Sequence, residues 1–286
     1  MNIKTVGVVG AGTMGRGIAH LAATSGYNVL LYDLGQDILD NAVASLSKLM
    51  DSRIERGKMT AEEKEAILNR ISLKTDLEAL ADVDIVIEAV IENLDVKKDV
   101  FKRLDEIVKK EAILASNTST MSITVLASQT KRPEQVAGMH FFNPPQVMKL
   151  VEVVRGYYTS DQTVETIFQF AKSMGKEPVE VKKDSPGFIV NRIMLAQFVE
   201  AIRLVEEGIA TIEDVDKAVT LGLNYPMGPF TLQDFAGVDI GLYALEYLYE
   251  ELKDDRFAPP QSLKRLIRAG RLGKKTGAGW YDYEKK

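Results

Sequence analysis

The feature that most constrains this chain is a glycine-rich turn near its start. The apolar run Val6-Gly7-Val8-Val9 leads into Gly10-Ala11-Gly12-Thr13-Met14-Gly15, apolar residues then recur at helical spacing, and a second apolar run ends in Leu31-Tyr32-Asp33. Gly10 allows a tight turn, and Gly15 lets a helix pack closely on the strand before it. A strand, a glycine turn, a helix and a second strand in this order predict a parallel sheet flanked by helices.

Short apolar runs alternate with segments of helical period up to about residue 182. This alternation predicts an α/β fold with a doubly wound sheet of the Rossmann type. The segment from residue 36 to residue 69 is charged and Leu-rich without strand character, so it predicts a pair of helices inserted into this domain. The expected strands are Thr5–Val9, Asn28–Tyr32, Ile85–Glu88, Ile113–Ser116, Gln135–Met139, Leu150–Val154 and Pro178–Val181.

A turn-forming cluster, Lys183-Asp184-Ser185-Pro186-Gly187, precedes a segment whose apolar residues keep helical spacing. We therefore expect two domains, a Rossmann domain over residues 1–184 and an all-helical domain over residues 185–286. The run from Ile189 to Val205 is apolar on more than one side, so part of this helix should face a second subunit, and Phe198 is expected to face outward. The apolar positions are Ile193, Met194, Leu195, Phe198, Val199, Ile202 and Leu204.

Charge and composition exclude several classes of protein. Lys and Arg number 36 and Asp and Glu 41, for a net charge of −5, and the basic residues do not cluster, which argues against a nucleic-acid partner. The absence of cysteine excludes disulfides, thiolate metal sites and a cysteine nucleophile, and the two histidines lack metal-ligand spacing, so we expect no metal. We expect a cytoplasmic protein without a membrane segment, because the first residues lack a signal-peptide pattern and the longest uncharged stretch, Ala112 to Thr130, is about half Ser, Thr, Asn or Gln.

The glycine turn also predicts a ligand. Gly12 lets the backbone approach a pyrophosphate at the helix N-terminus, and Asp33 stands where a carboxylate accepts hydrogen bonds from an adenosine ribose. Such glycines can serve packing alone, but the strand, helix and acid in register favour a dinucleotide site. No Arg follows Asp33, and its charge would repel a 2′-phosphate, so we expect NAD rather than NADP.

The two histidines differ in context. His20 lies inside the first expected helix and is interpreted as a packing or surface residue. His140 ends an apolar strand, and ligands of open α/β sheets bind beyond the carboxyl ends of strands. Glu152 lies within another apolar run, and a buried carboxylate requires a partner that an imidazole would provide. We therefore predict that His140 and Glu152 pair as an acid/base catalyst.

Six segments together resemble the L-3-hydroxyacyl-CoA dehydrogenase family, and within it the compact bacterial 3-hydroxybutyryl-CoA dehydrogenases. The resemblance extends over essentially the whole chain, and the His-Phe-Phe-Asn-Pro block is specific. Besides the glycine turn with Asp33, the matching segments are Ala115-Ser116-Asn117-Thr118-Ser119, Gly138-Met139-His140-Phe141-Phe142-Asn143-Pro144, Met148-Lys149-Leu150-Val151-Glu152-Val153, Ser185-Pro186-Gly187-Phe188-Ile189-Val190-Asn191-Arg192 and Lys274-Lys275-Thr276-Gly277-Ala278-Gly279-Trp280-Tyr281.

The resemblance implies an NAD-dependent enzyme that moves a hydride to or from C3 of a short acyl-CoA. His140 is then the acid/base, Glu152 orients it, and Ser119 and Asn191 contact the reacting part of the substrate. The cofactor contacts implied are the glycine turn, Asp33, Glu92, Lys97, Asn143 and Lys275. The second domain is then expected to bind substrate and to form a homodimer.

The contacts to CoA transfer less directly. Ser45, Lys48 and Arg56 in the inserted helices are the expected neighbours of its phosphates or adenine. Thr120 replaces a serine of many relatives and keeps the hydroxyl, and Pro145 is a second departure. Related proteins that act on carnitine or gulonate, and a non-catalytic NAD-binding protein, are the alternative functions. The latter would have no use for His140 and Glu152 together.

Overall fold

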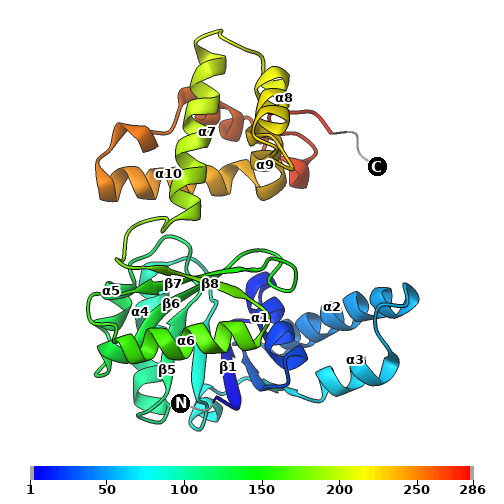
Figure 1. Ribbon diagram of the computed structural model, residues 1–286, viewed down its shortest axis with the longest axis vertical. Helices are drawn as coiled ribbons and strands as arrows, with labels where there is room; N and C mark the ends of the chain where they lie inside the picture. Colours follow the sequence, from blue (N-terminus) through cyan, green and yellow to red (C-terminus); the bar gives the residue numbers. More distant parts are fainter. Residues whose placement is uncertain (1–2, 284–286) are drawn as a thin grey trace. The chain divides into compact units, whose positions relative to one another are not determined.

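The computed structural model describes residues 3–283, and the chain divides between Asp184 and Ser185 into two compact units. The first unit is a sheet flanked by helices, and the second is built from helices (Figure 1). The strands are β1 (Thr5–Val9), β2 (Asn28–Tyr32), β3 (Ile71–Lys74), β4 (Ile85–Glu88), β5 (Ile113–Ser116), β6 (Val136–Phe141), β7 (Leu150–Arg155) and β8 (Glu177–Val181). The helices are α1 (Thr13–Thr24), α2 (Gln36–Glu55), α3 (Ala61–Leu68), α4 (Leu94–Ile107), α5 (Ile123–Ala127), α6 (Asp161–Ser173), α7 (Val190–Glu206), α8 (Ile212–Gly222), α9 (Pro229–Ala236), α10 (Val238–Leu252) and α11 (Gln261–Arg268).

The sheet has the order β3-β2-β1-β4-β5-β6-β7-β8. This arrangement confirms the predicted Rossmann-type α/β class. The carboxyl ends of β1, β4 and β5 lie next to one another, because Val9 pairs with Glu88 and Glu88 pairs with Ser116. Residues of the central strands are fully buried, as continuous apolar runs require when helices cover both faces.

The sheet differs from the sequence prediction in two places. β7 runs antiparallel to β6, so the sheet is mixed and not wholly parallel. Only residues 142–149 separate these strands, and a parallel pair needs a crossover of a dozen residues or more. The edge strand β3 was not predicted, because its four residues are only partly buried and lack a continuous apolar run.

The inserted helical pair is confirmed by α2 and α3, which lie side by side and project from the sheet next to α1 (Figure 1). The buried positions of α2 follow one helical stripe and are Leu39, Ala42, Leu46 and Met50. Helix α3 begins with a capping box, in which the Thr60 side chain accepts from the Glu63 backbone and the Glu63 side chain accepts from Thr60. The pair is therefore a regular packed element rather than an irregular loop.

The second unit has its own apolar core. Leu195, Phe198, Val199 and Ile202 of α7 pack there against side chains of α8 to α11. The prediction that Phe198 faces outward is wrong, because its side chain is only 3% exposed. Ile193 is the large apolar residue of α7 that faces solvent, with 64% exposure. Within residues 3–283, none of the helices has the length and apolar character that crossing a membrane requires.

Candidate active site

The glycine turn joins β1 to α1 with the geometry that a dinucleotide pyrophosphate requires. Gly10 has a φ of +102°, and a Cβ on Gly15 would lie 1.7 Å from the Gly10 carbonyl oxygen, so both positions exclude a side chain. A Cβ on Gly12 would have no atom within 4 Å. Gly12 is also the N-cap of α1 and has no side-chain cap among the described residues. The helix N-terminus therefore presents backbone N–H groups to open space, where an anion would bind.

Asp33 at the end of β2 supports this turn. One carboxylate oxygen accepts from the Ala11 N–H at 2.7 Å, and the other accepts from the Leu34 N–H at 2.7 Å. A carboxylate offers about four lone pairs, so two protein donors leave acceptor capacity for ribose hydroxyls. The turn and the acid therefore fit an adenosine dinucleotide.

A buried ion-pair network follows the carboxyl end of β4. The Lys97 ammonium lies 2.7 Å from Glu88 and 3.2 Å from Glu92, and Lys97 and Glu88 are essentially inaccessible to solvent. Glu88 also accepts from the Ser116 hydroxyl at 2.6 Å and from the Val90 N–H at 2.8 Å. The network thus ties the ends of β4, β5 and α4 together where the sheet meets the glycine turn.

Ser119 belongs to the same network through Glu92. The Glu92 carboxylate accepts from the Ser119 N–H at 2.9 Å, from the Ser119 hydroxyl at 3.2 Å and from the Thr118 hydroxyl at 2.6 Å. Burial raises the pKa of Glu92, but the Lys97 ammonium and these hydrogen bonds outweigh it and leave that pKa below its ordinary value. Thr120 contributes a further, longer contact of 3.4 Å to Glu92. The structure therefore brings together Glu92, Lys97 and Ser119, which the sequence resemblance had assigned separately.

His140 and Glu152 form the pair that the sequence predicted. They stand directly opposite each other on β6 and β7, and His140 Nδ1 lies 2.7 Å from a Glu152 carboxylate oxygen. Both side chains are buried, and the Phe142 ring packs on the imidazole with centroids 4.5 Å apart. An ionised carboxylate only accepts hydrogen bonds, so Nδ1 carries the hydrogen in this pair.

The chain from residue 142 to residue 149 connects these two strands and carries Asn143, whose side chain is exposed. The Phe141 N–H at its start donates to the Asn117 side chain at 2.9 Å. Pro145 is buried against α1, because a Cβ on Gly17 would lie only 2.9 Å from the Pro145 ring. The connection between the catalytic strands thus packs on the helix that begins at the glycine turn.

The remaining candidates belong to other elements. Asn191 is in the first turn of α7, in the second unit. Lys275 also belongs to the second unit, and its ammonium binds the Asp239 carboxylate at 2.7 Å. Ser45, Lys48 and Arg56 are exposed on or just after α2. At 100° per residue they fall within an arc of about 80° on that helix.

His20 is a buried packing residue. Its side chain is 2% exposed, and neither ring nitrogen has a hydrogen-bond partner among the described residues. Burial lowers the pKa of His20, and the nearby Arg53 lowers it further, which keeps the ring neutral.

Among the buried charged residues that sequence reasoning missed are Glu88 and Lys176. Glu88 ends the apolar run of β4 in the way that Glu152 interrupts that of β7, so the same signal was present. Lys176 lies in a polar turn before β8 and had no such signal. Among residues 3–283 no three His, Asp or Glu side chains gather as they would around a metal ion.

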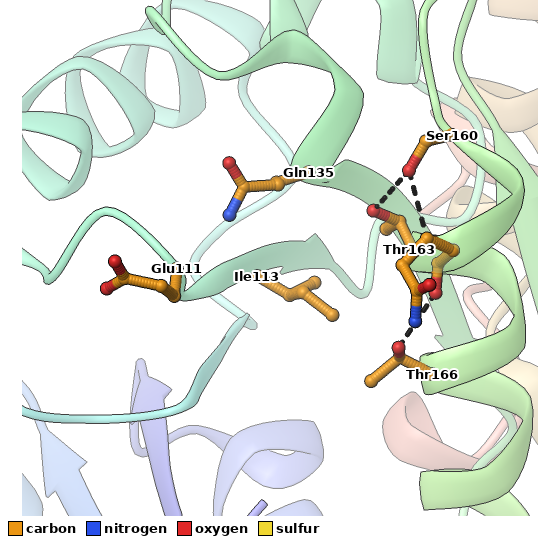
Figure 2. Close-up of a pocket in the computed structure, with 7 residues that line it drawn as sticks. Glu111, Ile113, Gln135, Ser160, Thr163 and Thr166 are labelled. Atoms are coloured by element: carbon orange, nitrogen blue, oxygen red, sulfur yellow. Dashed lines mark hydrogen bonds between the residues drawn. The ribbon is translucent and has the colours of Figure 1, made fainter. Parts of the chain in front are cut away.

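A separate pocket of about 260 Å³ lies at the amino ends of β5 and β6 (Figure 2). The Ser160 hydroxyl in its wall caps α6 by accepting from the Thr163 N–H, and the Thr166 hydroxyl donates to the Gln162 carbonyl. These polar groups serve the helix itself. Ligands of open α/β sheets bind at the carboxyl ends of the strands, which are opposite to this pocket, so the candidate active site remains there.

Comparison with known proteins gives two family matches. The NAD binding domain of 3-hydroxyacyl-CoA dehydrogenase matches residues 5–185, and the C-terminal domain of 3-hydroxyacyl-CoA dehydrogenase matches residues 187–283. These two ranges meet at the division between the two compact units.

Individual relatives match over nearly the whole chain. A probable 3-hydroxybutyryl-CoA dehydrogenase of Deinococcus radiodurans is 47% identical over 277 residues, which cover 97% of this chain and 99% of that protein. A 3-hydroxybutyryl-CoA dehydrogenase of Clostridioides difficile is 45% identical, with 97% of this chain and 99% of that protein covered. The crystal structure of (S)-3-hydroxybutyryl-CoA dehydrogenase from Ralstonia eutropha superposes with a TM-score of 0.96 at 44% identity and covers 99% of this chain and 100% of that chain.

Proposed function

Because the chain belongs to the 3-hydroxyacyl-CoA dehydrogenase family, we propose that it moves a hydride between NAD(H) and C3 of a short-chain 3-hydroxyacyl-CoA. The preferred pair of substrates is 3-hydroxybutyryl-CoA and acetoacetyl-CoA, by similarity to the named relatives. The observation that carries the proposal is the buried contact of 2.7 Å between His140 Nδ1 and Glu152. It supplies an oriented acid/base on the same sheet as a glycine turn that fits a dinucleotide.

In the oxidising direction, His140 Nε2 accepts the proton of the substrate hydroxyl as the C3–H bond breaks. A nicotinamide dinucleotide held by the glycine turn and Asp33 would supply the redox chemistry, as acceptor of the hydride from C3. The Glu152 carboxylate stabilises the imidazolium that results, and His140 returns the proton in the reducing direction. Ser119, held by Glu92, is proposed to contact the reacting oxygen together with Asn191.

The remaining cofactor contacts are also proposals. The first-turn N–H groups of α1 bind the pyrophosphate, and Asp33 binds the adenosine ribose. A free 2′-hydroxyl donates a hydrogen bond to this carboxylate, whereas the negative charge of a 2′-phosphate is repelled by it, so NAD is preferred over NADP. Lys97, Asn143 and Lys275 are the further residues assigned to the cofactor.

The exposed stripe of α2 is proposed to contact the CoA nucleotide. Lys48 and Arg56 supply two positive charges. The exposed Leu49 lies on the same face as Ser45 and Arg56, four residues after the first and seven before the second, and offers an apolar surface to adenine. Residues 1–184 are then proposed to bind NAD and, through α2, the CoA nucleotide, and residues 185–286 are proposed to contribute the rest of substrate binding and to dimerise. The dimer contact would use the exposed apolar side chains of the second unit, among them Ile193, Leu221, Phe235, Ile240 and Tyr243.

The test is a steady-state measurement of NADH and NADPH oxidation with acetoacetyl-CoA, longer 3-ketoacyl-CoAs, acetoacetyl-pantetheine and free acetoacetate. We expect the highest kcat/KM with NADH and acetoacetyl-CoA. The pantetheine thioester should show a raised KM and a similar kcat, because it lacks the nucleotide that α2 would contact. Turnover of free acetoacetate equal to that of acetoacetyl-CoA, or no turnover of any thioester, would overturn the proposal.

A further inference from the structure

Lys176 has a buried ammonium that the proposed mechanism does not use. It lies between α6 and β8, its side chain is 6% exposed, and no carboxylate within residues 3–283 lies at ion-pair distance. The ammonium donates to the Pro145 carbonyl at 2.5 Å and to the Met148 carbonyl at 2.8 Å. Both acceptors belong to the connection between β6 and β7.

The same connection is held from a second direction. Pro145 packs on Gly17 of α1, and the N–H groups of Val147 and Met148 both donate to the Pro144 carbonyl, at 2.9 and 3.0 Å. Asn143, assigned to the cofactor, directly precedes this turn, and His140 lies three residues before Asn143. The connection is therefore held between the nucleotide-binding helix and the Lys176 ammonium.

Burying an ammonium without a carboxylate partner is costly, and the loss of hydration lowers the pKa of Lys176. A neutral apolar side chain of the same length would avoid that cost but leave the Pro145 and Met148 carbonyls without their donors. A single point charge with several donors satisfies both carbonyls at once. Burial of the ammonium is therefore electrostatically unfavourable, but its two hydrogen bonds fix the position of the turn.

We propose that Lys176 is a positioning residue that holds the 142–149 connection, so that Asn143 meets the cofactor and His140 keeps its place opposite Glu152. The inference rests on the proposed function, because it concerns the placement of the proposed cofactor and acid/base residues. Its consequence is that loss of the ammonium changes cofactor affinity and turnover in a folded protein. A purely structural lysine would change thermal stability alone.

The experiment compares Lys176→Met with Lys149→Met as the matched control. Lys149 lies in the same connection, but its side chain is 78% exposed, and among residues 3–283 its one ion-pair partner is the exposed Glu177 at 3.8 Å. NADH affinity is measured by the fluorescence of the bound nicotinamide, kcat by acetoacetyl-CoA reduction, and folding by circular dichroism. We expect Lys176→Met to weaken NADH binding about fivefold and to lower kcat about tenfold, since small displacements of positioned groups have effects of this size or larger. Lys149→Met should match the wild type.

Chemical restoration of an ammonium at position 176 distinguishes loss of the two hydrogen bonds from a general disturbance of the fold. The chain has no cysteine, so Lys176→Cys introduces a single thiol. Alkylation with 2-bromoethylamine in denaturant, followed by refolding, restores an ammonium at nearly the length of lysine, and iodoacetamide gives a neutral control. Wild-type protein is taken through the same steps. Recovery of NADH affinity and kcat with the aminoethyl group alone supports the proposal, also where Lys176→Met does not fold.

Equal NADH affinity and equal kcat in folded Lys176→Met and wild type would overturn the inference, as would equal recovery with both alkylating agents. The proposed function fails in a different way, namely when wild-type protein turns over no thioester. The NADH titration then still decides the role of Lys176, because it does not depend on the acyl substrate.

Discussion

Replacing Glu152 by Gln tests the acid/base pair most directly. The charged pair is buried and its contact is 2.7 Å, so an imidazolium and a carboxylate have their charges about 4 Å apart. At an effective dielectric constant of about 20 this separation corresponds to an attraction of about 4 kcal/mol. A factor of ten in rate corresponds to about 1.4 kcal/mol, so complete loss of the attraction would lower kcat by about 10³.

The Gln amide keeps the shape of the side chain and one hydrogen bond, which is worth about 1 kcal/mol. The expected loss in kcat is therefore about 10², with NADH affinity unchanged. The assay is 3-hydroxybutyryl-CoA oxidation at saturating substrate, the direction in which the imidazolium forms, together with the pH dependence of kcat/KM and a NADH titration. Glu177→Gln, which alters an exposed carboxylate on β8, is the control and should behave as wild type. A folded Glu152→Gln protein with kcat within threefold of wild type, and with the same pH profile, would refute the reasoning.

Three further changes test other parts of the structure. Asp33→Ala should reduce the preference for NADH over NADPH by about tenfold or more by removing a repulsive charge, and an unchanged ratio of the two kcat/KM values would remove Asp33 from cofactor selection. Asp84 binds Lys109 and two N–H groups at the start of β1, and although burial raises its pKa these contacts leave that pKa below its ordinary value. The stabilisation that the ionised Asp84 gives the folded protein is therefore present above the unfolded carboxyl pKa of about 3.9 and is lost as pH falls through the lower folded pKa. Asp84→Asn should lower the free energy of unfolding by about 1 to 2 kcal/mol at pH 7 and by progressively less below pH about 4. Urea unfolding at a series of pH values measures this difference. Ile193→Glu should lower the mass measured by light scattering towards that of the monomer while NADH binding persists, and a monomeric wild type would contradict the proposed dimer.

Local pattern determined much of the first unit. The glycine turn, the buried strands and the inserted helical pair follow from residue types and periods that act over a few neighbours, and the structure places them as expected. The contact between His140 and Glu152 was predictable for a different reason. A carboxylate in an apolar strand must find a partner, and the chain offers few buried candidates.

Tertiary structure decided which groups meet when nothing local distinguishes them. The apolar pattern of β7 is the same for either direction, and the short connection to β6 made the pair antiparallel. Phe198 and Ile193 are both apolar residues of α7, but only the packing of α8 to α11 determines that the first is covered and the second is exposed. Lys176 reads as one of many surface lysines, since its acceptors are backbone carbonyls about 30 residues earlier. Backbone carbonyls are present at every position, so a hydrogen bond to one of them leaves no mark on the sequence until the fold brings donor and acceptor together.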